Sequence, residues 1–473
     1  MLTGIKFRAY PTAEQKQALS QWMGAGRVIW NAKYNQWQYE STYARKYLPV
    51  GTYACIDQTY SQFKDKELTP YLFQVPSQVL RNSAVNWFTT MQNWLDPQHP
   101  QTHPAKNKKK LDRGSVHLTK ELFRFETDLE SSRLRLFIGT TRKPLGYLEF
   151  NQHGLFQIPN SIRVKKNAGI WWVSFCYDDA VDEKTLLAAK TRLELFRKES
   201  EESLQNLVIG IDRGIAVAAH TDSEAFDYTP IEKENFKKKQ IRLKRYQRQM
   251  ARQKKGSNSR AKTKGKIARV HQKIANIRYN FCHQVSHRLT KTDDTPAKII
   301  VMEDLKIKNM TKAPKPKKNP ETGKWEKNGA SRKAGLNKAI LSIGWHKLET
   351  LVKYKVHRRG GLFVKISPHF SSQECAGCGH IHPDNRVSQA LFVCKLCGNR
   401  DNADRNAAQV LKKRAIKLIL NSGSELSDKG VLFLPDIGRG AQRKTSRVKP
   451  RSRSKEASKK MEVSKIPPEA LAL

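Results

Sequence analysis

The sequence predicts an α+β protein with several domains, and three observations support this fold class. Alternating apolar and polar residues, typical of short strands joined by turns, dominate residues 111–177. Two short apolar runs, which end at Asp212 and Glu303, have the composition of strands buried inside an α/β sheet. Segments with helical periodicity surround both regions. A chain of 473 residues has room for about three domains.

The charge balance predicts a polyanionic partner. The chain has 88 lysines and arginines against 43 aspartates and glutamates, a net charge of +45, and only 38% of its residues are apolar. This excess is larger than solubility requires, so we expect nucleic acid as the partner, with a merely basic solvated surface as the alternative. The sequence contains neither an apolar run of about 18 residues nor the apolar core of a signal peptide. We therefore expect a cytoplasmic protein that binds no membrane.

The N-terminal part is expected to combine a strand, two helices and a small β-barrel. Residues 5–10 alternate as a strand does, and Thr12 followed by Gln15 has the pattern of a capping box at the start of a helix. A second helix is expected over 77–95, followed by a basic, Pro-rich loop to residue 110. The strands of 111–177 are expected to form a barrel that the first strand closes. Four aromatic residues of the first helix fit either core packing or base stacking: Trp22, Trp30, Tyr34 and Trp37.

The middle of the chain holds its longest basic run. A charged helical linker is expected at 182–205, then the strand that ends at Asp212 and a second short strand at 216–219. Residues 236–289 predict two helices separated by a Gly-Ser-Asn-Ser break. Like charges along a helix destabilise it, so this run is expected to bind phosphates rather than only face solvent. The residues expected to bind nucleic acid are Lys237, Lys238, Arg242, Arg245, Arg248, Arg252, Lys254 and Lys255.

Further elements are expected toward the C-terminus. The Lys-rich loop after Glu303, at 313–335, fits either a lid over a site or a disordered linker. A helix at 336–358 and a strand at 362–366 should precede the cysteine pairs, and a last helix should cover 404–420. The composition of residues 422–473 predicts a basic, disordered tail.

Three carboxylates are expected to meet at one edge of the sheet. Asp212 and Glu303 each end a strand, and Asp404 opens a helix whose apolar face packs on the sheet. Clustered acids repel one another unless cations neutralise them, and oxygen ligands select Mg²⁺ or Mn²⁺, a pair of which can activate water for phosphodiester hydrolysis. Each acid alone also fits a helix cap or a turn. Asp304 is an alternative to Glu303, because strand alternation lets only one of the two face the site.

The cysteines indicate a metal site in a reduced compartment. Four of the seven form two CxxC pairs with fifteen residues between them: Cys375, Cys378, Cys394 and Cys397. Four thiolates at this spacing form a closed, tetrahedral and therefore structural Zn²⁺ site. A redox CxxC is the competing interpretation, but it does not explain two pairs. His380 and His382 are further candidate ligands, although four sulfurs already fill the coordination shell.

Several stretches together resemble the TnpB family, the transposon-encoded RNA-guided nucleases related to type V CRISPR effectors. The matching stretches run from residue 5 to about residue 411: IKFRAYPTAEQ, GAGRVIWN, VIGIDRGI, the basic hairpin QMARQKKGSNSRAKTKGK, IIVMEDL, NKAILSIGWHKLETLVKYK, and ECAGCG with FVCKLCGNRDNADRNAA. The chain departs from the family at Asn402, where a further acid is frequent. The linker at 182–205 and the tail match nothing in the family.

The resemblance implies a domain arrangement. Residues 1–10 and 111–181 would form a wedge-like β-barrel with an inserted helical recognition lobe at 11–110. After the linker, residues 206–370 and 401–421 would form a RuvC-like (RNase H fold) nuclease domain that carries the basic hairpin at 232–290 and an inserted zinc ribbon at 371–400. Its three acidic residues match Asp212, Glu303 and Asp404.

The resemblance also implies an activity and partners. The expected protein is an RNA-guided DNA endonuclease of a transposable element that uses a transposon-derived guide RNA, a target-adjacent motif and two Mg²⁺ ions. Its partners would be the guide RNA and double-stranded target DNA. It would act as a monomer in a prokaryotic cytoplasm, on the nucleoid when bound to DNA. A nuclease-inactive RNA-guided regulator or transposition accessory protein, and an unguided structure-specific nuclease, are the alternatives.

Overall fold

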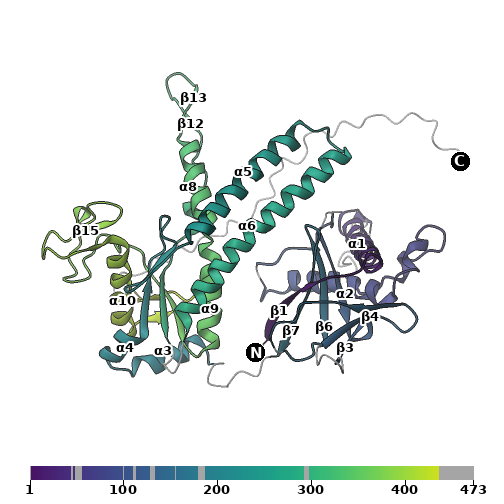
Figure 1. Cartoon of the computed structure of the whole chain (residues 1–473), viewed down its shortest axis with the longest axis horizontal. Helices are drawn as coiled ribbons and strands as arrows, with labels where there is room; N and C mark the ends of the chain where they lie inside the picture. Colours follow the sequence, from purple (N-terminus) through teal and green to yellow (C-terminus); the bar gives the residue numbers. More distant parts are fainter. Residues whose placement is uncertain are drawn as a thin grey trace.

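The chain folds into an N-terminal and a C-terminal body, and a long helical hairpin extends from the second (Figure 1). The computed structural model describes residues 2–43, 46–47, 56–99, 101–109, 113–127, 134–154, 156–178, 187–291 and 298–435. Among these residues, no helix is both long and apolar enough to cross a membrane.

The N-terminal body contains two antiparallel sheets. The first has the order β1 (Leu2–Ala9), β7 (Ile170–Asp178), β6 (Ser161–Asn167), β2 (Arg113–Thr119). The second consists of β3 (Phe123–Thr127), β4 (Leu134–Gly139) and β5 (Pro144–Leu148). The first strand pairs with β7, as the sequence predicts.

The expected barrel is not confirmed: in the described residues no sheet closes on itself, although an isolated bridge between Ala9 and Phe150 links the two sheets. The strands instead bury their apolar sides in one core shared by both sheets and the two N-terminal helices, to which Phe7, Leu136 and Phe175 contribute. A shared core satisfies the alternating pattern without a closed ring of hydrogen bonds.

Two helices cover this core: α1 (Ala13–Thr42) and α2 (Ser77–Leu95), with short 3₁₀ turns η2 (Ser61–Phe63), η3 (Pro70–Leu72) and η4 (Lys120–Leu122). The capping box is confirmed, since the Gln15 amide donates to Thr12 Oγ1 at 3.2 Å and the Thr12 amide to Gln15 Oε1 at 3.1 Å. The aromatic residues of α1 pack in cores: Trp22 and Trp30 are buried, and Tyr34 and Trp37 contact the cluster around Trp30.

The C-terminal body is built on a parallel sheet with the order β14 (Leu362–Ile366), β11 (Ile299–Glu303), β8 (Val208–Ile211). One face packs on α10 (Ala403–Leu420), α3 (Ala189–Arg197) and α4 (Glu201–Leu207). The other face packs on α6 (Asn258–Thr290) and α9 (Trp345–Arg358). Helix α10 lies so close to β8 that a Cβ at Gly210 would be 2.1 Å from the Ala408 carbonyl oxygen, so only glycine fits there.

The helical hairpin expected from the basic run is present. Helix α5 (Pro230–Arg252) and α6 are separated by residues 253–257, and Ser257 caps α6. Two expected elements differ. The strand expected at 216–219 is reduced to β9 (Ala219–His220), which pairs with β10 (Ala225–Phe226). The helix expected at 336–358 is divided into α8 (Ala330–Ile343) and α9, because Gly344 between them has φ = +88°.

The region expected as a tail begins with ordered structure. Residues 425–433 form a small hairpin of β17 (Glu425–Leu426) and β18 (Leu432–Phe433), because Leu426 and Leu432 are buried in the core beneath α10. The expectation of disorder from residue 422 is therefore wrong for 422–435, and residues 436–473 lie outside the described part. The remaining short elements are α7 (Ile307–Met310), β12 (Lys317–Lys318), β13 (Trp325–Glu326), η6 (Pro383–Asn385), β15 (Leu391–Val393) and β16 (Arg400–Asn402).

Candidate active site and metal centre

The structure brings the three expected carboxylates together. In the parallel register Met302 lies opposite Ile211, so Asp212 and Glu303, the residues that follow them, both lie at the carboxyl edge of the sheet. Asp404 arrives from the first turn of α10, which packs on β8. The negative charges of Glu303 and Asp404 both act on Asp212. A Cβ at Gly214, in the loop after Asp212, would lie 3.8 Å from Asp404 Oδ2, so this loop also borders the cluster.

The pKa values of two of the three carboxylates, Asp212 and Glu303, are raised. Burial, and then the charges of Glu303 and Asp404, raise the pKa of Asp212 to about 7, while Arg386 acts in the opposite direction. Burial also raises the pKa of Glu303, although the Ser371 hydroxyl opposes the shift by donating to Glu303 Oε1 at 2.7 Å. Burial and neighbouring carboxylates therefore disfavour the ionised form of these acids, and bound divalent cations would offset this effect.

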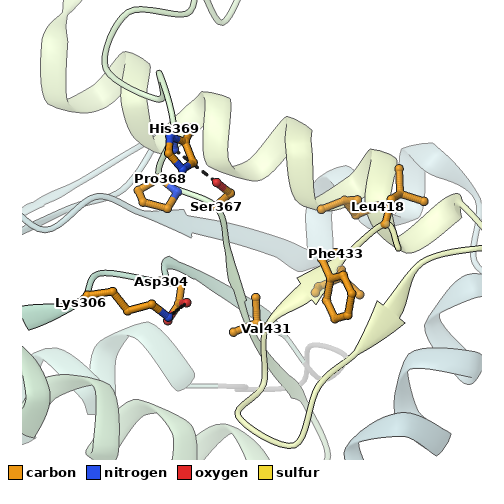
Figure 2. Close-up of a pocket in the computed structure, with 10 residues that line it drawn as sticks. Asp304, Lys306, Ser367, Pro368, His369, Leu418, Val431 and Phe433 are labelled. Carbon is orange, nitrogen blue, oxygen red and sulfur yellow. Dashed lines mark hydrogen bonds and ion pairs between the residues drawn. The ribbon is translucent and has the colours of Figure 1, made fainter. Parts of the chain in front are cut away.

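Asp304 faces a different part of the molecule. Its carboxylate pairs with Lys306 and with Lys365, the latter at 3.2 Å. Figure 2 shows Asp304 and Lys306 at the edge of a separate pocket of about 430 Å³, across from His369 and Phe433. The geometry thus favours Glu303 over Asp304 as the third acid, as expected for neighbours on alternate faces of a strand.

Two arginines at the site have no counterpart among the residues expected from the sequence. Arg386, in the loop between the cysteine pairs, forms an ion pair with Asp404 at 3.1 Å. Arg213 is buried, and its guanidinium donates to the Glu303 carbonyl oxygen at 2.6 Å and to Glu349 Oε2 at 3.0 Å. Arg213 could have been noticed because it follows Asp212 directly. Arg386 lies eighteen residues before Asp404, with no local pattern that marks it.

The four expected cysteines form one cluster. Their Sγ atoms all lie within 4.8 Å of one another, a spacing suited to four ligands around one metal ion. The closest pairs, Cys375 with Cys397 at 3.7 Å and Cys378 with Cys394 at 3.6 Å, are too far apart for disulfides. Neither His380 nor His382 belongs to the cluster found in the described residues.

Turn geometry shapes each half of the cysteine cluster. Gly379 and Gly398, which follow the second cysteine of each pair, have φ = +78° and +69°. Their amides donate back to the carbonyl oxygens of Cys375 and Cys394, which closes each CxxC turn. These conformations favour glycine, as the sequence predicts.

Residues 371–400, which carry the four cysteines and are called the cysteine module below, are hydrogen-bonded to α10, the helix that carries Asp404. The buried Asn406 accepts from the Ala376 amide at 2.9 Å and donates to the Glu374 carbonyl oxygen at 2.7 Å. Strand β16 leads directly from the second cysteine pair into α10. The position of Asp404 therefore depends on the fold of the module.

The eight cations of the basic hairpin that the sequence assigns to nucleic-acid binding are all exposed. Lys238, Arg242 and Arg245 follow an i, i+4, i+7 spacing and so share one face of α5, whereas Lys254 and Lys255 lie in the turn before α6. None of the eight residues is buried, although Lys238 also forms an ion pair with Glu234 at 2.6 Å, so these side chains can reach a phosphate backbone.

A second basic surface lies in the N-terminal body. A groove of about 1560 Å³ runs between α1, α2 and the first sheet. Exposed amides line it together with cations: Gln17, Gln21, Asn107, Arg113, Arg163, Lys165 and Lys166. Amide groups can read base edges and cations can hold phosphates, so the groove combines both requirements for sequence-dependent binding. Sequence reasoning missed this site, because its residues come from distant segments.

The raised pKa of Asp212 predicts how stability depends on pH without added divalent cations. Because its pKa is about 7 in the folded protein against 3.8 for an ordinary aspartate, its stabilising contribution is complete below about pH 4 and is lost as the pH rises through 7. We expect Asp212→Asn to stabilise the folded state at pH 8 by up to about 4 kcal/mol and to change little at pH 4. Thermal unfolding followed by circular dichroism at both pH values measures this effect.

Asp304→Asn is the matched control, since it should have the opposite sign. Although burial opposes the shift, Lys306 and Lys365 lower the pKa of Asp304. Its contribution is therefore present above about pH 4, and Asp304→Asn should lower the unfolding temperature at pH 8. Equal responses of the two variants would contradict the assigned electrostatics.

Three family models match the chain. A model described as "Probable transposase" covers residues 181–313, a "Cas12f1-like, TNB domain" covers 345–411, and a "Helix-turn-helix domain" covers 1–42. The last description differs from the structure, because the described residues 2–42 form the strand β1 and the single helix α1.

Full-length relatives are also similar. A "Putative RNA-guided DNA endonuclease InsQ" of Escherichia coli (strain K12) is 29% identical over 415 residues, which is 86% of this chain and 91% of the relative. A "Putative RNA-guided DNA endonuclease" of Streptomyces pristinaespiralis is 26% identical over 86% of this chain and 87% of its own length. The protein in a cryo-EM structure of a Cas12f1–sgRNA–target DNA complex is 12% identical, with a TM-score of 0.46, over 87% of this chain and 98% of that one. The matching family models and relatives support the resemblance to the TnpB family that the sequence indicates.

Proposed function

We propose that the protein is an RNA-guided DNA endonuclease of a transposable element. The observation that carries this function is the meeting of three carboxylates from β8, β11 and α10 at one sheet edge, in a chain with a net charge of +45. The relatives named as RNA-guided DNA endonucleases support the same activity. The guide would come from the transposon itself, and target DNA would be chosen by base pairing with it.

Asp212, Glu303 and Asp404 would hold two Mg²⁺ or Mn²⁺ ions. The donor set fits such ions, because it consists of carboxylate oxygens whose pKa values are raised by burial and, for Asp212, by the neighbouring acids, an effect that bound cations would offset. Bound there, the ions supply an activated water and stabilise the leaving oxygen. Asp212 and Asp404 would each present an oxygen to the metals, while Ser371 orients the carboxylate of Glu303. Arg386, released from Asp404, would be free to hold a phosphate oxygen of the DNA.

The four cysteines would hold a structural Zn²⁺ ion. Thiolates in a closed set of four leave no position for substrate, so the role of this ion is to fold residues 371–400. Through Asn406, that fold would keep Asp404 at the sheet edge.

The nucleic acids would bind at the two basic surfaces. We assign phosphate contacts to Lys237, Lys238, Arg242, Arg245, Arg248, Arg252, Lys254 and Lys255 on the helical hairpin. The groove of the N-terminal body, with its amides beside cations, would read the target-adjacent motif. In this arrangement residues 11–110 serve as the recognition lobe, and residues 206–370 with 401–421 serve as the nuclease domain. We propose that one copy of the chain carries all of these surfaces.

Sequencing of copurified RNA, together with plasmid cleavage, tests the function. The full chain, expressed with its flanking DNA, should copurify with one discrete RNA and should cut a plasmid that matches this RNA in the presence of Mg²⁺. Cleavage without a discrete RNA would instead indicate an unguided nuclease. Binding of guide and target without cutting at any Mg²⁺ concentration would indicate a regulator.

A further inference from the structure

The loop between Glu303 and α8 contains a hairpin of β12 and β13. It matches neither of the two expectations from the sequence, a lid over a site or a disordered linker. Strands β12 and β13 pair across a turn in which Gly323 has φ = +66°. Asn319 Oδ1 accepts hydrogen bonds from the backbone amides of Glu321 at 2.8 Å and Thr322 at 3.0 Å. Figure 1 shows the hairpin projecting from the end of α8, away from the three-stranded sheet. It therefore does not cover the carboxylate cluster in this structure.

The two faces of this hairpin differ in charge and in polarity. Trp325 lies opposite Lys318, and Glu326 lies opposite Lys317, so each pair occupies one face. On the second face Lys317 is neutralised by Glu326 at 2.7 Å. On the first face the indole of Trp325 is 72% exposed, although tryptophan is normally largely buried. The Trp325 face thus presents an aromatic ring beside a lysine that has no carboxylate partner among the described residues.

The surroundings of the hairpin are strongly basic. Residues 312–333 contain eight lysines and arginines and two glutamates, Glu321 and Glu326. An ideal Cβ at Gly323 would lie 3.9 Å from Lys318 Cε, so the side chain of Lys318 extends along the turn. An aromatic ring flanked by cations is the combination that binds single-stranded nucleic acid, in which bases are free to stack and phosphates lie at both sides.

We propose that the Trp325 face of the 312–329 hairpin binds a single-stranded segment of nucleic acid. Trp325 stacks on an unpaired base, and Lys318, which lies opposite it, holds an adjoining phosphate. This inference rests on the proposed function for one point, the source of the single strands. An RNA-guided nuclease exposes both unpaired guide RNA and separated DNA strands. Residues 314–344 lie outside all three matching family models, so the site is a feature of this chain rather than of those models. A duplex offers no free base, so it should not use this site.

Three substitutions of Trp325 test the stacking. The full-length protein, freed of RNA at high salt, is titrated without Mg²⁺ into fluorescein-labelled single-stranded RNA, single-stranded DNA and duplex DNA of one sequence, and binding is followed by anisotropy. Trp325→Ala should weaken binding of a single strand about 5- to 100-fold and leave the duplex unchanged. Trp325→Phe should keep most of the affinity, whereas Trp325→Leu should resemble alanine. Because Trp325 is exposed, all three variants should unfold at the wild-type temperature.

The two lysines supply a matched pair of charge variants. Lys318→Gln should reduce the slope of log affinity against log salt concentration by about 1, and Lys317→Gln, on the neutralised face, should leave it unchanged. Loss confined to the RNA probe assigns the guide as ligand, and loss confined to single-stranded DNA assigns a DNA strand.

Several results would overturn the inference. Trp325→Ala could bind every probe as tightly as the wild type, or the two lysine variants could behave alike. Full affinity in Trp325→Leu would show an apolar contact, such as one with a protein, instead of stacking. Since binding is measured without cutting, failure here is separate from failure of the proposed function, which absence of a discrete RNA and of plasmid cleavage would reveal.

Discussion

Asp212→Ala is expected to abolish cleavage of a matched plasmid while the protein still binds its guide RNA and its target. The substitution removes one oxygen donor for the divalent ions, and the remaining acids cannot replace it because each is fixed by its own element of the fold. A loss of about 10³-fold or more in the cleavage rate is expected. Single-turnover cleavage on a gel and target binding by mobility shift measure the two effects separately. Asp404→Asn, which keeps the size of the side chain, should give the same result.

Asp304→Asn is the control for this experiment. Asp304 is adjacent to Glu303 in sequence, yet its carboxylate pairs with Lys306 and Lys365 beside a separate pocket. Cleavage should therefore stay within a few-fold of the wild type. If Asp304→Asn abolished cutting and Asp212→Ala did not, the assignment of the acids would be wrong.

Cys378→Ser is expected to remove the bound zinc and, with it, most of the nuclease activity. Cys378 is exposed, so the substitution loses little packing, and its effect reports on the metal. Without the ion the 371–400 segment should lose its fold, because structural zinc sites supply the folding free energy of such segments. Arg386 and Asp404 would then lose their support, and cleavage should fall about 10- to 100-fold. Elemental analysis should find about one zinc per chain in the wild type and none in the variant.

Cys176→Ser is the matched control for the zinc experiment. Cys176 is also an exposed, free cysteine, but it lies on β7 in the N-terminal body. This variant should keep both zinc and activity. Retention of zinc and full activity in Cys378→Ser would show that the four thiols are not a structural metal site.

The sequence allowed the carboxylates and the cysteines to be chosen because both follow from local patterns. The carboxyl ends of parallel strands lie at the same edge of a sheet. Acids that end two such strands are therefore neighbours, as Asp212 and Glu303 are. The CxxC spacing likewise determines its own turn geometry, independently of the rest of the fold. Their roles in catalysis and zinc binding remain predictions for the experiments above.

Other features depend on contacts between distant segments, which a local pattern does not contain. Arg386 reaches Asp404 only because the cysteine module folds back on α10. Alternation and the family resemblance both predict a barrel, but alternation is equally satisfied by two sheets that share a core. Gly344 was taken as part of one helix, but its left-handed backbone ends α8 and starts α9. The groove of the N-terminal body combines residues from Gln17 to Lys166, so only the fold reveals it.

The close approach at Gly210 limits how the nuclease can be switched on. With 2.1 Å between the site of a Cβ on Gly210 and the Ala408 oxygen, α10 cannot slide toward β8 without a backbone collision. Gly210 is two residues before Asp212, and Ala408 is one turn after Asp404, so the same contact limits how closely these two acids can approach each other. Glu303 and Asp404 thus already act on Asp212 electrostatically in the protein without nucleic acid. We therefore expect control over cutting to act at another step, such as the release of Asp404 from its ion pair with Arg386.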